Sequence, residues 1–326
     1  MKTVSVVIPT YNEEDNIVNI CNRVRELFLN ALQSYDYEII FIDNHSTDRS
    51  REIIEKLCRA DKGVKAIFNA RNFGFNRSVY YGLLQGTGDC TALIFADMQD
   101  PPEMLVDFVR AWEQGHRIVV GVKTKSRENS LMYAVRSAFY KGINRITEIS
   151  HIDQYDGFGL YDKSFIEVLK TLNDPMPYLR GIVAELGYDR LEISYEQRAR
   201  VAGKTTFSFM RYYDVAMLGI TSYSKVVMRL ATICGFIMSI ISFLIGIVTL
   251  IIKLVNWEYF EVGFAALLVG VFFLGSILLF FLGFQGEYIL SINTRVMNRP
   301  LVVEDKRLNF GERDASGREI SAATEH

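Results

Sequence analysis

The sequence lacks several features that mark common protein classes. It has no excess of one charge sign, because 36 Lys and Arg residues stand against 38 Asp and Glu residues for a net charge of −2. That balance argues against a dedicated nucleic-acid binder, which usually carries a basic surface. Cysteine is scarce, with four in 326 residues. The cysteines lie far apart without metal-ligand spacing, which favours reduced thiols in a cytosolic compartment.

Two nucleotide-binding motifs and a secretion signal are also missing. No GxxxxGK[ST] loop occurs and no GxGxxG follows the first candidate strand, which argues against an NTPase or a dinucleotide-binding protein. The N-terminal sequence MKTVSVVIPTYNEED has an apolar run too short for a signal peptide, and acidic residues follow at once. We therefore expect no cleaved leader.

The sequence contains two unusually long uncharged runs. Hydrophobic residues make up 49% of the chain beside 23% charged residues. Leu230–Ile252 and Val262–Phe284 each contain 23 residues without a charge. At about 1.5 Å per residue, each helix would cross a hydrocarbon core of about 30 Å. Since only residues 253–261 separate the runs, we predict a transmembrane hairpin. Flanking basic residues place both termini in the cytoplasm by the positive-inside rule.

Short β-rich runs alternate with helical patterns in the first part of the chain. The predicted strands are Val4–Ile8, Tyr37–Asp43, Val64–Asn69, Thr91–Ala96 and Arg117–Val122. The predicted helices lie near Glu14–Leu32, Thr47–Ala60, Asn76–Gln85 and Pro102–Gln114. This alternation predicts a doubly wound α/β fold, with a mainly parallel sheet and helices on both faces. Ligands of such sheets bind at the carboxyl ends of the strands, so the residues after each strand are the candidates.

Polar residues follow the first two predicted strands. The segment PTYNEE at residues 9–14 follows the first, and Asn12 within it is predicted to cap a helix. Asp43 ends the second strand, where a carboxylate would accept a hydrogen bond from a base or a ribose. Ser46 or Thr47 would cap the helix that follows.

The residues after the fourth strand predict a metal site. Asp97 and Gln99 are two residues apart, so on a strand end both side chains would point the same way. Two oxygen ligands there suit Mg²⁺ or Mn²⁺ shared with a diphosphate. Asp100, directly before Pro101 and three residues before Glu103, is predicted to cap the next helix instead.

In combination, these motifs resemble the family-2 glycosyltransferases. The resemblance rests on PTYNEE, the Asp-ended second strand with its S-T-D, RNFG, ADMQDPPE and the two spans, and it covers about residues 1–300. More narrowly, the chain resembles the polyprenyl-phosphate glycosyltransferases, which include dolichyl-phosphate mannose synthases and bactoprenol glucosyltransferases. The resemblance implies a GT-A fold, a nucleotide-sugar donor, a divalent metal, inversion at the anomeric carbon and a membrane-embedded polyprenyl-phosphate acceptor.

The resemblance also implies roles for individual residues. Those expected to contact the nucleotide sugar are Pro9, Tyr11, Glu13, Asp43, Arg71 and Asp97. Asp97 and Gln99 match the metal-binding D-x-Q, so Mg²⁺ or Mn²⁺ is the expected cofactor. Asp97 and Asp156 are the candidate catalytic carboxylates. The basic residues expected at the acceptor phosphate are Lys123, Arg136, Arg198, Arg200 and Lys204.

Three segments depart from the family pattern. Asn44 and His45 replace the second Asp and the Gly of D-D-G-S. Phe95 stands where relatives often have an acidic residue, which removes one candidate metal ligand. Around Asp156, where many relatives have G-D-F-R-L-M-D, the acidic position is shifted and Gly159 replaces the Arg. Whether Asp156 acts as a base or orients the sugar or acceptor is therefore left open.

These features predict an order of domains. Residues 1–200 form a cytoplasmic GT-A domain, 201–229 interfacial amphipathic helices, 230–252 and 262–284 the spans, and 285–326 a cytoplasmic tail. Residues 198–229 contain six basic residues and one acidic residue among aromatic ones, which favours helices lying on anionic lipid. The alternative is an ordinary packed helix with a solvated face.

The predicted function is transfer of one sugar, from a UDP-hexose such as UDP-glucose, to undecaprenyl phosphate. It would supply cell-envelope glycan modification at the inner membrane. One alternative is a processive polysaccharide synthase, although neither tryptophan ends a Q-x-x-R-W segment. The other is a catalytically inactive membrane-anchored scaffold, against which Asp97 and Gln99 argue. Glycines in the second span would permit close helix contact and a homo-oligomer.

Overall fold

The computed structural model of the chain describes residues 1–125, 152, 154–198, 217–218, 221–222, 226–255 and 264–311. Three predicted acceptor residues, Arg136, Arg200 and Lys204, and most of the predicted interfacial segment 201–229 lie outside these ranges. The described residues fall into two compact units. One contains the sheet with its helices and the residues from 298 onward, and the other contains two long helices.

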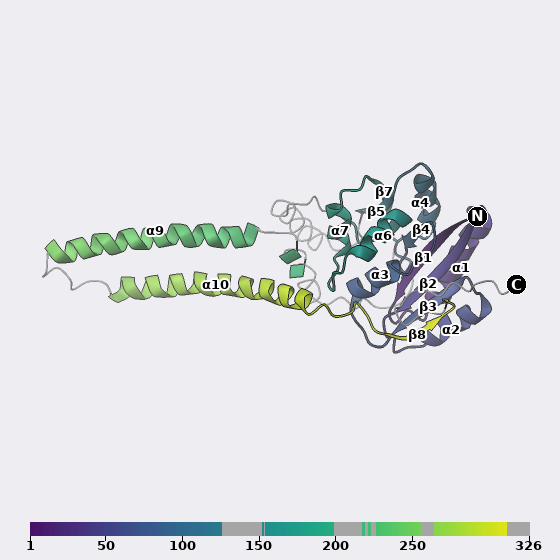
Figure 1. Cartoon of the computed structure of the whole chain (residues 1–326), viewed down its shortest axis with the longest axis horizontal. Coiled ribbons are helices and arrows are strands. Elements are labelled where there is room, and N and C mark those ends of the chain that lie inside the picture. The colour runs from purple at the N-terminus through teal and green to yellow at the C-terminus, as the bar shows by residue number, and fades with distance from the viewer. Residues whose placement is uncertain are drawn as a thin grey trace. The chain divides into compact units, whose positions relative to one another are not determined.

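The sheet unit is built on eight strands in the order β7-β5-β6-β4-β1-β2-β3-β8 (Figure 1). The strands are β1 (Lys2–Thr10), β2 (Tyr35–Asp43), β3 (Val64–Asn69), β4 (Cys90–Leu93), β5 (Ile118–Lys125), β6 (Gly159–Asp162), β7 (Arg190–Glu196) and β8 (Glu304–Leu308). Strands β4, β1, β2 and β3 run parallel, as do β5 and β7. Strand β6 lies antiparallel between β4 and β5, and β8 pairs antiparallel with β3.

Helices cover both faces of this sheet. They are α1 (Ile17–Asn30), α2 (Ser50–Ala60), α3 (Phe75–Leu83), α4 (Met104–Glu113), α6 (Lys163–Thr171) and α7 (Leu179–Glu185). Side chains alternate along β1, so Val6 packs in one hydrophobic core with α1, α2 and α4. Its neighbour Val7 packs in the other core with α3, α6 and α7. Because side chains alternate along a strand, β1 contributes residues to both cores.

The structure confirms the α/β part of the prediction and corrects its details. The first five strands exist, but β4 ends at Leu93 and not at Ala96. The sheet is mixed, because β6 and β8 add antiparallel pairs. Strands β6, β7 and β8 were missed. β8 has the sequence EDKRL, which offers almost no apolar alternation to recognise.

Two long helices contain the first uncharged run and residues 264–284 of the second. They are α9 (Val226–Val255), of 30 residues, and α10 (Phe264–Val296), of 33 residues. Large apolar side chains are exposed along both, including Phe236, Val248 and Leu279. By length and composition, one stretch of the described residues, Phe273–Val296, qualifies to cross a membrane. The predicted two-span hairpin therefore stays a prediction.

Candidate functional site

The carboxyl ends of β1 and β2 bring together the first group of predicted residues. Thr10 pairs with Asp43 at the end of the two parallel strands. Pro9 lies one residue earlier on β1, and Tyr11 and Glu13 follow in the next loop, where both are half-buried. The predicted nucleotide-contacting residues of β1 and β2 therefore share one edge of the sheet.

Hydrogen bonds hold the loops after β1 and β2 against each other. The Asn12 backbone N–H donates to Ser46 Oγ at 2.9 Å, and the Glu13 N–H donates to Ser50 Oγ at 3.0 Å. Asn12 Oδ1 accepts from the Thr47 N–H at 2.8 Å. Asn12, Ser46 and Thr47 were predicted as helix caps, but α1 begins at residue 17 and α2 at residue 50. These polar side chains instead fix the two loops together.

Asp43 is fully buried and only partly satisfied. Its Oδ2 accepts a hydrogen bond from the Ser46 N–H at 3.1 Å and lies 3.8 Å from Arg51 Nε. Its Oδ1 has no hydrogen-bond partner among the described residues. Burial raises the pKa of this carboxyl, although Ser46 and Arg51 act in the opposite direction. Asp43 thus has a buried acceptor atom, Oδ1, without a partner in the described part of the chain.

The structure explains Asn44, which departs from the family pattern. Its Oδ1 accepts hydrogen bonds from Asn69 Nδ2 at 3.1 Å and from the Phe73 N–H at 3.0 Å. Its Nδ2 donates to Asn72 Oδ1 at 3.0 Å. An aspartate could accept the first two bonds but could not donate the third. The amide therefore suits the asparagine network that this chain has built between β2 and β3.

Arg71 and Phe95 lie among aromatic rings near the site. The guanidinium of Arg71 lies 4.1 Å from the centre of the Phe73 ring, and the side chain is exposed. The Phe95 ring packs 5.8 Å from that of Phe75 at the start of α3. Phe95 thus fills space where relatives often place an acidic residue.

Asp97 and Gln99 lie in the loop after β4. Both are partly exposed, whereas Met98 and Asp100 beside them are buried. Met98 has a positive φ of 54°, and the Gln99 N–H donates to Asp97 Oδ1 at 3.2 Å. The prediction placed both side chains on the end of a strand, but β4 ends at Leu93. Their exposure therefore comes from the loop and not from strand alternation. Because β1 lies between β2 and β4, Asp43 and the loop with Asp97 and Gln99 follow two strands that lie about 10 Å apart across the sheet.

The chemistry of Asp97 and Gln99 fits a divalent cation that also binds substrate phosphates. Mg²⁺ usually takes one or two protein oxygens and fills its other positions with water and phosphate oxygens. Within the described ranges, no group of three or more His, Cys, Asp or Glu side chains gathers to hold a metal. The residues present therefore suit an ion that takes most of its ligands from the substrate and water, and not an ion held by protein side chains alone.

Asp100 belongs to a buried polar cluster, which corrects its prediction as a helix cap. Helix α4 begins at Met104, and its N-cap residue Glu103 makes no side-chain capping bond. Asp100 Oδ1 instead accepts a hydrogen bond from Tyr195 Oη at 2.6 Å. It also lies 3.4 Å from Lys123 Nζ.

The same lysine holds the candidate catalytic carboxylate. Lys123 Nζ pairs with Asp156 Oδ2 at 2.5 Å, so one ammonium serves two carboxylates. Burial raises the pKa of Asp100 to about 7, and repulsion from Asp156 adds to that rise. Burial lowers the pKa of Lys123, but the attraction of Asp156 and Asp100 outweighs it and the pKa is raised. Sequence reasoning missed Asp100 and Tyr195, since no motif links residues 95 positions apart.

Arg198 contacts the loop that contains Asp97 and Gln99. Its backbone N–H donates to the Gln99 carbonyl oxygen at 2.8 Å. Its Nη1 lies 3.1 Å from Glu103 Oε2, and the side chain is half-exposed. The structure therefore brings Arg198 next to Gln99.

Comparison with known proteins identifies sequence relatives over most of the chain. Residues 5–169 match the family model described as Glycosyl transferase family 2. The chain is 32% identical over 304 residues to the SfII prophage-derived bactoprenol glucosyl transferase of Shigella flexneri, covering 93% of this chain and 97% of that protein. It is 31% identical over 303 residues to an uncharacterized glycosyltransferase of Bacillus subtilis (strain 168), covering 93% of each.

Solved structures show a weaker likeness. Glucosyl-3-phosphoglycerate synthase from Mycobacterium tuberculosis, in complex with phosphoglyceric acid, superposes with a TM-score of 0.47 at 17% identity. The match covers 68% of this chain and 78% of that chain.

Proposed function

Because this chain belongs to glycosyl transferase family 2, within the polyprenyl-phosphate glycosyltransferases, we propose that it moves a single sugar from a nucleotide donor to polyprenyl phosphate. The observation that carries the proposal is the placement of polar side chains on either side of β1. Asp43 ends β2 with a buried Oδ1 that has no partner among the described residues, and Asp97 and Gln99 lie partly exposed in the loop after β4. The relative named as a bactoprenol glucosyl transferase supports a bactoprenol lipid acceptor and a glucosyl donor, for which we propose undecaprenyl phosphate and UDP-glucose.

The donor would lie across the ends of β1, β2 and β4. Asp43 Oδ1 would accept a hydrogen bond from the base, beside Pro9, Tyr11 and Glu13. Asp97 and Gln99 would hold Mg²⁺ or Mn²⁺, which when bound neutralises charge on the departing diphosphate. Since β1 lies between β2 and β4, the nucleotide would span β1 to reach both groups.

The acceptor needs placement more than activation. A phosphate monoester has a second pKa of about 6, so at pH 7 it is mostly a nucleophilic dianion. One of its oxygens would bond to the anomeric carbon as the bond from that carbon to the donor's phosphate oxygen breaks. The nucleoside diphosphate leaves with the electron pair, and the configuration of the sugar inverts.

Basic side chains would hold the acceptor phosphate. Arg198 is proposed for this role because its backbone bonds to Gln99 and its side chain, paired with Glu103, is half-exposed. Lys123 is already paired with Asp156 and Asp100, so it would reach the phosphate only by giving up a carboxylate. Asp156 would then be free to orient the sugar or the acceptor. Arg136, Arg200 and Lys204 complete the proposed set.

Membrane attachment would keep this site close to the lipid. We place the spans at 230–252 and 262–284, with both termini in the cytoplasm and the protein in the inner membrane. Helix α9 covers the first run and α10 covers residues 264–284 of the second, and both helices expose large apolar side chains, which supports a lipid environment for them. The basic segment before α9 would meet the lipid phosphates at the membrane surface.

A transfer assay tests the proposal. The purified full chain in detergent would be mixed with undecaprenyl phosphate, Mg²⁺ or Mn²⁺, and each of a panel of radiolabelled nucleotide sugars. We expect metal-dependent label in the lipid fraction with a UDP-hexose. Asp97→Ala should lower the rate by about a hundredfold, as for loss of a group that stabilises charge in the transition state. Asp107→Ala, an exposed aspartate on α4, is the matched control and should keep full activity.

The products distinguish the competing functions. One sugar per lipid supports the proposal, whereas a growing polymer would indicate a processive synthase. Absence of lipid-linked label with every donor would contradict transfer to a lipid and favour an inactive scaffold. Full activity of Asp97→Ala would remove Asp97 from the metal site.

A further inference from the structure

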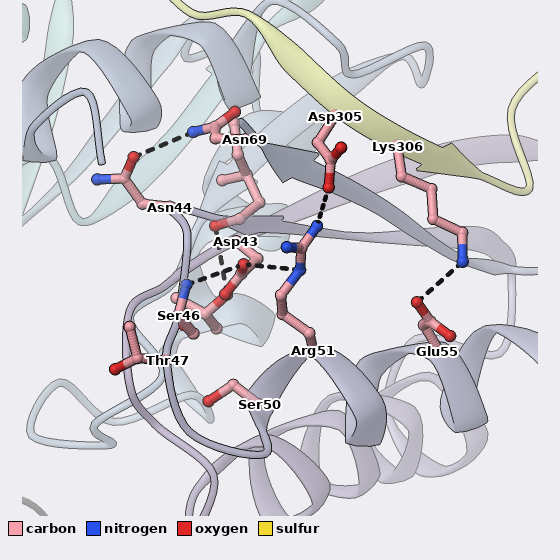
Figure 2. Close-up of polar contacts among 12 residues, drawn as sticks. Asp43, Asn44, Ser46, Thr47, Ser50, Arg51, Glu55, Asn69, Asp305 and Lys306 are labelled. Carbon is pink, nitrogen blue, oxygen red and sulfur yellow. Dashed lines mark hydrogen bonds and ion pairs between the residues drawn. The ribbon is translucent and has the colours of Figure 1, made fainter. Parts of the chain in front are cut away.

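Arg51 lies between a buried carboxylate of the candidate site and the C-terminal strand. It is the second residue of α2. Its Nε lies 3.8 Å from Asp43 Oδ2, and its Nη2 lies 2.5 Å from Asp305 Oδ2. Figure 2 shows the guanidinium placed between the two carboxylates. One side chain thus links the end of β2 to β8.

The two contacts of Arg51 differ in strength. The bond to Asp305 has hydrogen-bond length, whereas 3.8 Å to Asp43 is an electrostatic contact without a hydrogen bond. The guanidinium carbon also lies 5.0 Å from the centre of the Phe68 ring on β3. Asp305 therefore supplies the strongest directional restraint on the guanidinium among these three neighbours.

Asp43 depends on this guanidinium for its charge balance. The Asp43 side chain is 0% exposed, and Arg51 is the described cation within ion-pair distance of it. An ionised carboxylate in so buried a place is costly unless it is paired and hydrogen-bonded. Its Oδ1 is still unpartnered, so the pair leaves one acceptor atom available.

Strand β8 is itself firmly attached, so Asp305 is a fixed anchor. The Ala70 N–H donates to the Val303 carbonyl at 2.9 Å, and Tyr81 Oη donates to Glu304 Oε1 at 2.6 Å. Asn309 Nδ2 donates to the Cys58 carbonyl at 2.6 Å. These bonds attach β8 to β3, α3 and the end of α2.

We propose that Arg51 is a positioning residue for nucleotide binding, and that Asp305 of the C-terminal strand holds it where it keeps Asp43 charged and oriented toward the base. The inference rests on the proposed function, since it assumes that Asp43 Oδ1 accepts from a base N–H. The C-terminal strand would thereby take part in donor recognition although none of its residues touches the donor.

The geometry predicts what happens when Asp305 loses its charge. The Arg51 side chain is 30% exposed, so a guanidinium without its strongest partner would turn toward water. Asp43 would then keep only its bond from Ser46. A carboxylate that is less ionised and less fixed accepts a hydrogen bond from the base more weakly. The variant should therefore lose affinity for ligands that carry a base.

The test measures nucleotide affinity by isothermal titration with the full chain in detergent and Mg²⁺. UDP and GDP are the base-bearing probes, and inorganic pyrophosphate is the probe without a base. We expect Asp305→Asn to raise the Kd of the preferred nucleotide by about fivefold, the size of one ion pair of about 1 kcal/mol. Arg51→Lys should act in the same direction, because an ammonium cannot face two carboxylates as a planar fork does. The Kd of pyrophosphate should not change.

Lys306→Met is the matched control. Lys306 Nζ pairs with Glu55 Oε1 at 2.9 Å, so this variant removes the neighbouring β8–α2 ion pair and leaves Arg51 untouched (Figure 2). It should bind nucleotide as the wild type does. If Lys306→Met weakened nucleotide binding as much as Asp305→Asn does, or if Asp305→Asn weakened pyrophosphate binding equally, the inference would be overturned. The attachment of β8 to the sheet would then explain the effect without Arg51.

The outcomes separate this inference from the proposed function. If the wild type binds nucleotide and Asp305→Asn binds it with the same Kd, the role of Arg51 and Asp305 is overturned but the proposed function is not. A wild type that binds neither nucleotide in the presence of metal would overturn the proposed function and this inference with it.

Discussion

Outside α9 and α10, the described carboxyl whose pKa is shifted most is that of Asp100. It is 2% exposed and lies among Tyr195, Lys123 and Asp156. Because Lys123 is shared between two carboxylates, it cannot fully compensate both. The cluster therefore has one residue that stays protonated more readily than an exposed aspartate.

This residue should give the protein a pH-dependent stability. The pKa of Asp100 is raised to about 7 in the folded protein, above the value of about 3.9 expected when unfolded. The folded state therefore holds the proton more tightly, and the stability this gives is present below about pH 4 and lost as the pH rises through 7. Asp100→Asn should remove that dependence. Thermal melts of the full chain in detergent from pH 4 to 8 would show the wild-type Tm falling relative to the variant.

The matched control for this prediction is Asp107→Asn on the exposed side of α4. Its melting curve should follow the wild type at every pH. Parallel pH profiles for wild type and Asp100→Asn would contradict the raised pKa.

At the scale of elements, β6 decides where Asp156 lies. This strand is inserted antiparallel between β4 and β5, and Asp156 comes three residues before it begins. Gly159, the first residue of β6, faces the β5 backbone so closely that an added Cβ would lie 2.4 Å from the Val119 carbonyl oxygen. A side chain at position 159 would therefore clash with the β5 backbone.

Gly159→Ala should loosen β6 and destabilise the sheet unit. Overpacking of this kind costs about 1–3 kcal/mol, so we expect a lower Tm and, since Asp156 would move, a lower transfer rate. The measurement is a thermal melt with a parallel activity assay. Gly270→Ala in α10, where no heavy atom lies within 4 Å of the added Cβ, is the control. Equal stability of the two variants would argue against the contact.

At the scale of the whole molecule, the C-terminal segment completes the sheet. Strand β8 follows the long helices in the chain and pairs with β3, which ends at residue 69. It covers an edge that would otherwise expose unpaired backbone groups. The sheet unit therefore combines residues that precede α9 in the chain with residues that follow α10.

Deleting residues 303–326 should destabilise the sheet unit. Loss of the β3–β8 ladder and its ion pairs should cost about 2 kcal/mol or more, which corresponds to roughly 4–8 °C in Tm for a unit of this size. The exposed β3 edge should also promote aggregation. Thermal melts and size-exclusion chromatography in detergent would measure both effects. Deletion of residues 312–326 alone spares β8 and should behave as wild type.

Much of the fold followed from local patterns. Apolar runs in β1 to β4 are buried between helices on both sides, and such runs can be recognised without tertiary information. The uncharged runs likewise predicted α9 and α10. Asp43 and Asp97 were identified because a parallel sheet presents the ends of its strands at one edge.

Other elements carried no such pattern. β7 is half-exposed along most of its length, and β8 is mostly charged. The helix-cap predictions were wrong because Asn12 and Asp100 have better partners elsewhere in the fold. A capping residue and a tertiary hydrogen-bond acceptor are the same chemical group, so local sequence does not separate them.

By itself, the sequence determined the strand–helix alternation, the apolar helices and the candidate donor residues, because each depends on residues close along the chain. Tertiary structure alone decided which side chains meet, such as Asp100 with Tyr195 and Arg51 with Asp305, 254 residues apart. Hydrogen bonds and ion pairs act over a few ångströms in space and leave no periodic trace in the sequence.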